Sequence, residues 1–174
     1  MASEQMRTLK ALRMAIQMEI DGKEYYLKIS QQASSKMGEN LLRSLSKAED
    51  SHRQKFIDIY GATRDKNKWP NITLKPTAKN MSTVFSKATK KTAGTETLPE
   101  EADAVIIAMK MENQTVDFYT KQAAKAQGET EKRFYDTITS EEREHHKVLQ
   151  DYFEFLKDPT GFFVRTEHHS LDGG

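Results

Sequence analysis

The stretch SEEREHHK, residues 140–147, holds three glutamates and two histidines in eight positions. Glu142 and His145 are three residues apart, and residues at that spacing share one face of an α-helix. Apolar residues continue this face at alternating spacings of three and four, which is typical of an amphipathic helix buried along one seam: Tyr135, Ile138, Leu149, Tyr152 and Leu156. An acid and an imidazole therefore lie inside a row that is predicted to be buried.

The neighbouring polar residues fall outside this row. His146 is rotated about 100° from His145 by the period of the helix, so it is predicted to face away from the core. Glu144 is also predicted to lie off the inner face. Of the two adjacent histidines, the pattern selects only His145 for a buried site.

Three other stretches show the same spacing, and the four predicted helices cover residues 4–34, 38–66, 98–126 and 129–157. The second seam contains Leu42, Leu45, Glu49, His52, Phe56 and Ile59. The third contains Ala102, Val105, Met109, Glu112, Val116, Tyr119 and Ala123. The first contains Leu9, Leu12, Ile16, Glu19, Tyr26 and Ile29, and Lys23 interrupts it. Each predicted helix thus carries at least one glutamate inside an apolar row.

An internal repeat relates the two halves of the chain. AIQMEIDGKEYYLK, residues 15–28, aligns with AMKMENQTVDFYTK, residues 108–121. The same offset carries Glu49 to Glu142 and His52 to His145. The sequence therefore predicts an all-α four-helix bundle made of two repeated helical hairpins, with a crossover at 67–97, one domain at 1–157 and a C-terminal tail at 158–174.

The repeated polar residues predict a dinuclear metal site. Each half supplies one glutamate from its first helix and a glutamate–histidine pair from its second, and such a set can hold two metal ions inside a bundle. Two divalent ions would neutralise four carboxylates, which are very costly to bury unpaired. Oxygen and nitrogen donors favour two iron ions, with manganese or zinc as alternatives. The predicted ligands are Glu19, Glu49, His52, Glu112, Glu142 and His145.

Two tyrosines follow the first glutamate of each half by about two helical turns. Tyr26 and Tyr119 either donate hydrogen bonds to ligand carboxylates or are core tyrosines whose hydroxyl groups are satisfied elsewhere, and the sequence leaves both readings open.

Composition restricts the other classes of function. The chain of 174 residues has a net charge of +1, so the overall field gives no reason to expect a nucleic-acid or membrane partner. No stretch approaches the roughly 18 apolar residues of a membrane span, and the N-terminus has no signal-peptide core, which predicts a cytoplasmic protein. The absence of cysteine excludes disulfides, thiolate nucleophiles and cysteine-ligated metals.

These residues resemble the rubrerythrin-like branch of the ferritin-like di-iron proteins, over about residues 5–157. The resemblance implies a ferritin-like bundle, the same six ligands and a non-haem di-iron oxidoreductase that reduces hydrogen peroxide or dioxygen. Rubrerythrins carry a further glutamate three residues after the third-helix ligand, where this chain has Thr115, and a cysteine-ligated rubredoxin domain, for which this chain has no cysteine. Electrons are therefore expected from an external donor such as a rubredoxin-like or other small redox protein.

Several alternatives remain open at this stage. The same six residues would serve a ferroxidase or iron-handling protein, or a non-catalytic structural bundle with inert metals such as zinc. The crossover, with seven lysines and no acidic residue from Lys66 to Thr95, is either a solvated loop with a short helix near 79–91 or a docking surface for an acidic donor. His168 and His169 are expected in a solvated or loosely packed tail. The sequence does not distinguish a monomer from a homodimer.

Overall fold

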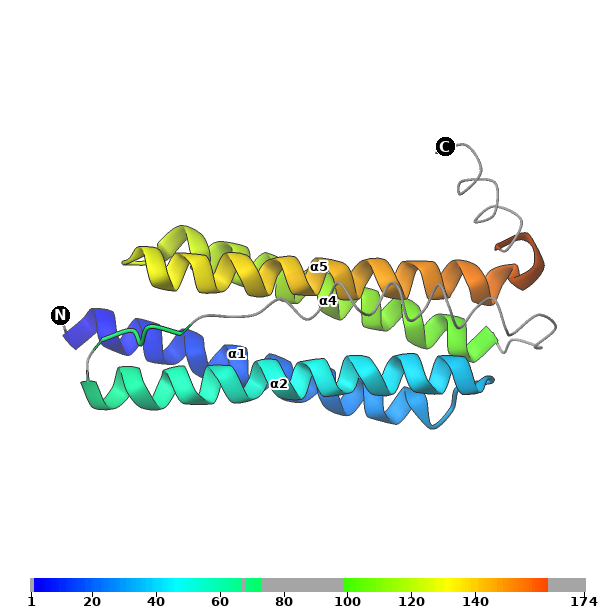
Figure 1. Ribbon diagram of the computed structural model, residues 1–174, viewed down its shortest axis with the longest axis horizontal. Coiled ribbons are helices and arrows are strands. Elements are labelled where there is room, and N and C mark those ends of the chain that lie inside the picture. Colours follow the sequence, from blue (N-terminus) through cyan, green and yellow to red (C-terminus); the bar gives the residue numbers. More distant parts are fainter. Residues whose placement is uncertain (1, 67, 73–98, 163–174) are drawn as a thin grey trace.

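Four long helices make up most of the part of the chain that the structure describes, shown in Figure 1. The computed structural model describes residues 2–66, 68–72 and 99–162. The helices are α1 (Ala2–Ser30), α2 (Lys36–Lys66), α4 (Pro99–Lys125) and α5 (Glu129–Lys157). Helix α1 packs along α2 and α4 along α5, and the two hairpins lie side by side in Figure 1. The predicted all-α bundle of two hairpins is therefore confirmed.

Two apolar clusters fill the core, one on each side of a polar layer. The first cluster, at the end where α1 meets α2, includes Tyr26, Ile29, Leu41, Leu42, Leu45, Val105, Val148, Leu149 and Tyr152. The second, near the start of α5, includes Leu12, Ala15, Phe56, Ile59, Tyr119, Ala123, Phe134, Tyr135 and Ile138. Burying these side chains supplies the main driving force for folding, at about 25 cal/mol per Å² of apolar surface.

The inner rows of α1 and α4 differ slightly from the predicted ones. Ala15 and Ala108 are fully buried, whereas the predicted seam residues Ile16 and Met109 are only half-buried. A straight helix with 3.6 residues per turn drifts away from a strict 3.5-residue seam, so the buried position moves by one residue. Where Lys23 interrupted the predicted apolar row of α1, the buried residue is Gly22.

Helix α1 ends at Ser30, four residues before the predicted end, so that boundary was wrong. The backbone N–H groups of Gln31 and Gln32 bond to carbonyls only three residues back, at 3.2 and 3.1 Å, which tightens and closes the helix. Ser35 then caps α2, because its Oγ accepts the Gly38 N–H at 3.0 Å. Helix α2 therefore begins two residues earlier than predicted.

A buried carboxylate joins this loop to the other hairpin. Glu101, 6 % exposed, accepts hydrogen bonds from the Ser34 N–H at 3.0 Å and from the hydroxyl of Tyr152. Sequence reasoning missed Glu101, although its spacing from Val105, Ala108 and Glu112 continues the inner row of α4. This contact joins the α1–α2 loop to α4 and α5 at the end of the bundle that contains the first apolar cluster.

Several predicted features lie outside the described residues. These are most of the crossover, including its five central and distal lysines and the short helix near 79–91, and the tail histidines His168 and His169. Among the described helices, none is both long and apolar enough to span a membrane.

Two glycines of α2 give opposite predictions for stability. A Cβ at Gly38 would lie 1.8 Å from the Tyr152 hydroxyl, so Gly38→Ala should displace Tyr152 from Glu101 and cost about 1–3 kcal/mol. A Cβ at Gly61 would meet nothing within 4 Å, so Gly61→Ala should stabilise the helix by about 0.5–1 kcal/mol. Urea unfolding of both variants measures the difference, and equal effects would contradict the close approach at Gly38.

Candidate metal centre

The six predicted ligands lie together in the polar layer, and each is at most 4 % exposed. They form two groups of four, in which one ligand atom of each residue lies within 4.8 Å of the others. The first group is Glu19, Glu49, His52 and Glu142, and the second is Glu49, Glu112, Glu142 and His145. The fold thus brings together residues that are up to 126 positions apart, from all four helices.

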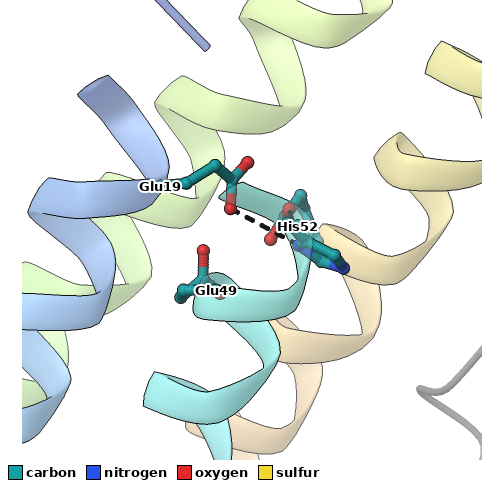
Figure 2. Close-up of side chains that lie close together, drawn as sticks. Glu19, Glu49 and His52 are labelled. Carbon is teal, nitrogen blue, oxygen red and sulfur yellow. Dashed lines mark ion pairs between the residues drawn. The ribbon is translucent and has the colours of Figure 1, made fainter. Parts of the chain in front are cut away.

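Helices α1 and α2 present three members of the first group, Glu19, Glu49 and His52, which Figure 2 shows, and α5 presents the fourth, Glu142. Nδ1 of His52 lies 3.4 Å from Oε2 of Glu19, the ion pair that is dashed in Figure 2, and 3.0 Å from Oε1 of Glu142. His52 therefore directs Nδ1, rather than Nε2, at the carboxylates of this group.

The second group repeats this arrangement. Nδ1 of His145 lies 2.9 Å from Oε1 of Glu49, 3.0 Å from Oε2 of Glu142 and 3.7 Å from Oε1 of Glu112. The two imidazole rings stack with their centroids 5.6 Å apart and their planes at 17°. The two histidines hence face one shared cluster from opposite hairpins.

Glu49 and Glu142 belong to both groups. Each carboxylate has two oxygens, so each of these residues can contact two ions at once, while Glu19 with His52 and Glu112 with His145 would serve one ion each. This assignment makes Glu49 and Glu142 the candidate bridging ligands.

The donor atoms fit a metal ion. The buried atoms with no hydrogen-bond partner among the described residues include Oε2 of Glu19, Oε1 of Glu49, both oxygens of Glu142 and Nδ1 of each histidine. Buried polar groups are normally satisfied, and unsatisfied ones cost about 1–3 kcal/mol each. Ligands at about 2.0–2.2 Å from an ion are separated by distances like those between these atoms. Two metal ions would satisfy the cluster and neutralise its charge.

Each of the two tyrosines donates a hydrogen bond to a predicted ligand of the other hairpin. This favours the first of the two predictions for Tyr26 and Tyr119, that they bond to ligand carboxylates. Tyr26 of the first hairpin donates its hydroxyl hydrogen bond to Oε1 of Glu112, and Tyr119 of the second donates to Oε1 of Glu19. Burial raises the pKa of both phenols well above the usual value, and the adjacent glutamates add to the shift. Both phenols therefore stay protonated and act as donors that orient a carboxylate from the other hairpin.

Glu141 is a site residue that sequence reasoning missed. It is 2 % exposed, and its Oε2 lies 2.5 Å from Nε2 of His52, on the side of the ring away from the cluster. A metal-ligating histidine is usually oriented by such a partner. The repeat could not reveal Glu141, because the equivalent residue of the first half is Ala48, but its spacing of three from Ile138 and four from His145 could have.

The two histidines consequently have different surroundings. Nε2 of His145 is buried with no hydrogen-bond partner in the described part of the chain. Among the described residues a carboxylate contacts Nε2 of His52 but none contacts Nε2 of His145, so the two candidate metal positions are not equivalent.

Two further predicted positions lie beside the site without joining it. His146 lies next to Asn113, with 3.2 Å between Nε2 and the amide nitrogen, and it belongs to neither group of candidate ligands. Thr115 donates its hydroxyl hydrogen bond to the Met111 carbonyl of its own helix at 3.0 Å. Its repeat partner Gly22 lets α1 approach Glu49, since a Cβ there would lie 3.3 Å from Oε2 of Glu49.

Burial and mutual repulsion shift the protonation of the cluster. Burial raises the pKa of Glu49 well above its usual value and that of Glu112 to about 7, and Glu142 adds to both shifts. Burial opposes ionisation of Glu142 as well, but the two histidines lower its pKa overall. Burial opposes protonation of His52 and His145, yet Glu142 and the other carboxylates raise the pKa of both. Without metal, protons must supply the compensating positive charge.

A four-helix bundle with two carboxylate–histidine groups that share two glutamates defines a ferritin-like protein with a candidate dinuclear carboxylate site. The chain belongs to the rubrerythrin family, whose family model matches residues 10–153. This match confirms the family resemblance of the sequence. Comparisons with curated proteins and with solved structures gave no significant match.

Neighbouring histidines provide a matched test of the predicted ligands. His145→Ala removes a donor from the second group and should lower the bound metal below two ions per chain, whereas His146→Ala should leave it unchanged. Elemental analysis of the two purified variants and of the native protein measures the stoichiometry. If only the His146 variant lost metal, the ligand would be His146 and the predicted His145 would be wrong.

The metal-free protein should become less stable as the pH rises from about 5 to about 8. Glu49 and Glu112 have raised pKa values in the folded state, so folding binds protons that are lost as the pH passes through these values. The raised pKa values of His52 and His145 act in the same direction above about pH 6.5. The lowered pKa of Glu142 acts oppositely, but only below about pH 4.3.

Thermal unfolding with and without metal measures this dependence. The metal-loaded protein should melt at a higher temperature and with a weaker pH dependence over this range, because the ions replace the protons. Identical melting curves that do not change with pH would contradict a buried charged cluster.

Proposed function

We propose that the protein is a non-haem di-iron oxidoreductase that reduces hydrogen peroxide with electrons from an external donor. The observation that carries the proposal is the pair of ligand groups that share Glu49 and Glu142 in a buried layer. Membership of the rubrerythrin family, a family of di-iron carboxylate proteins, favours iron over manganese and zinc.

The electron count supports peroxide as the oxidant. Two ferrous ions held by these residues would supply two electrons, and hydrogen peroxide takes two electrons and two protons to give two molecules of water. Dioxygen needs four electrons to reach water, twice what the centre holds. A dinuclear site is thus matched to peroxide in one encounter.

The protein's own residues hold and shield the site. Tyr26 and Tyr119 each fix one oxygen of a glutamate from the opposite hairpin, which leaves that carboxylate oriented for a metal. Glu141 fixes the His52 ring. The apolar clusters on both sides limit the entry of water that would compete for the metal. These contacts preorganise the ligands before the oxidant arrives.

Electrons must reach the centre from outside this chain. The sequence has no cysteine for an iron–sulfur or rubredoxin site of its own. A small redox protein or a low-molecular-weight reductant is therefore the proposed partner.

The reaction of the ferrous protein distinguishes the proposal from its alternatives. We expect stopped-flow mixing to show faster oxidation by hydrogen peroxide than by dioxygen, and continued turnover only when a reductant is supplied. His145→Ala should lose this reaction, whereas the matched His146→Ala variant should retain it. Faster oxidation by dioxygen with release of ferric iron would instead indicate a ferroxidase, and a purified protein that holds only zinc and shows no redox reaction would indicate a structural bundle.

A further inference from the structure

A continuous row of aromatic rings leads from the metal centre to one end of the bundle. Tyr119, which donates to Glu19, has its ring centroid 6.1 Å from that of Tyr135. Tyr135 in turn lies 5.6 Å from Trp69. These distances are those of aromatic rings in direct contact. Three side chains that can be oxidised by one electron therefore touch in sequence.

The other side of the centre has no such row. Tyr26 holds Glu112 as Tyr119 holds Glu19, but its apolar neighbours belong to the first cluster, and no ring contact joins it to another aromatic residue in the described part of the chain. The repeat thus places equivalent tyrosines at the two ends of the site, and among the described residues only Tyr119 of the two is connected to further rings.

The outer end of the row is accessible. Trp69, the single tryptophan of the chain, is half-buried and lines a cavity of about 530 Å³ together with Thr63 and Lys68. Its indole nitrogen is buried and has no hydrogen-bond partner among the described residues. A small reductant in this cavity would lie against the last ring of the row.

We propose that Tyr119, Tyr135 and Trp69 form an electron relay between the metal centre and this cavity. This inference rests on the proposed function, because it requires a redox-active metal. The relay acts when the metal centre holds only one electron, because the reduction of peroxide to water takes two. The relay then supplies the missing electron and protects the ligands from oxidation.

The transfer balances at each step. Tyr119 gives one electron to the centre while its phenolic proton shifts along the existing hydrogen bond to Glu19, and Tyr135 and then Trp69 replace that electron, so the proton returns. A one-electron reductant in the cavity restores Trp69. Without a reductant, Trp69 loses two electrons and two protons and gains an oxygen atom from water, and the peroxide that accepts these electrons and protons becomes two waters.

The location of the oxidised side chain tests the relay. Iron-loaded protein is treated with repeated additions of hydrogen peroxide without reductant, and peptide mass spectrometry measures the fraction of Trp69 that has gained one oxygen. We expect this modification in the iron-loaded protein, its loss in the zinc-loaded protein, and its suppression by a small one-electron reductant.

Three tyrosine variants separate the relay from direct attack by peroxide. Tyr119→Phe and Tyr135→Phe keep the packed rings but cannot be oxidised at the phenol, so Trp69 modification should fall to the level of the zinc-loaded protein. Tyr26→Phe is the matched control, because it removes the same kind of hydrogen bond to a ligand glutamate without interrupting the row. Trp69 modification in the Tyr26 variant, expressed per oxidised iron, should stay well above that of the zinc-loaded protein. Metal content and melting temperature are measured for each variant, so that a loss of iron is not mistaken for a broken relay.

The outcomes distinguish the relay from the proposed function. Equal Trp69 modification in all three variants, or equal modification with zinc, would overturn the relay. The optical spectrum of the iron reports oxidation of the centre independently, and a ferrous centre that peroxide oxidises while Trp69 stays unmodified would overturn the relay but leave the proposed function intact. If peroxide fails to oxidise the centre, the proposed function is overturned, and the same variants are compared with dioxygen as the oxidant.

Discussion

The cost of burying charge governs this structure. Four carboxylates and two imidazoles occupy one layer of the core, each at most 4 % exposed. Such groups are tolerated in an apolar interior only when opposite charge lies beside them. Several contacts of this layer join the two hairpins: Tyr26 to Glu112, Tyr119 to Glu19, and His145 to Glu49. Metal bound in this layer would therefore also hold the two hairpins together.

The two halves match in their ligands and differ in what surrounds them. A carboxylate, Glu141, supports His52, whereas the equivalent position beside His145 is Ala48. Ring contacts continue from Tyr119 to Tyr135 and Trp69, whereas Tyr26 has no ring contact with another aromatic residue in the described part of the chain. A hydrogen-bonded carboxylate makes an imidazole a more basic ligand, so the contact of Glu141 with His52 would act on a bound metal as well. A site built by repetition thus acquires two unlike positions through residues outside the ligand set.

The two ends of the bundle are also built differently. At one end Glu101 ties the α1–α2 loop to α5 through Ser34 and Tyr152, and Gly38 packs against that hydroxyl. At the other end Trp69 folds onto Phe134 and Tyr135 and lines an open cavity. The first arrangement fixes the geometry of the hairpins, and the second gives the core a contact with molecules outside.

The sequence by itself determined the helices, their pairing into two hairpins and the six residues of the candidate site. The helical period of 3.6 residues shows which side chains are buried, and the repeat shows which buried polar residues recur. The sequence also determined that His145 rather than His146 faces the core. Only the tertiary structure decided which glutamates belong to both groups, how the tyrosines cross between hairpins, that α1 ends at Ser30, and that Glu141, Glu101 and the ring row of Tyr119, Tyr135 and Trp69 take part. Each of these depends on contacts between residues far apart in the chain, and helical periodicity gives the face of a residue but not its partner on another helix.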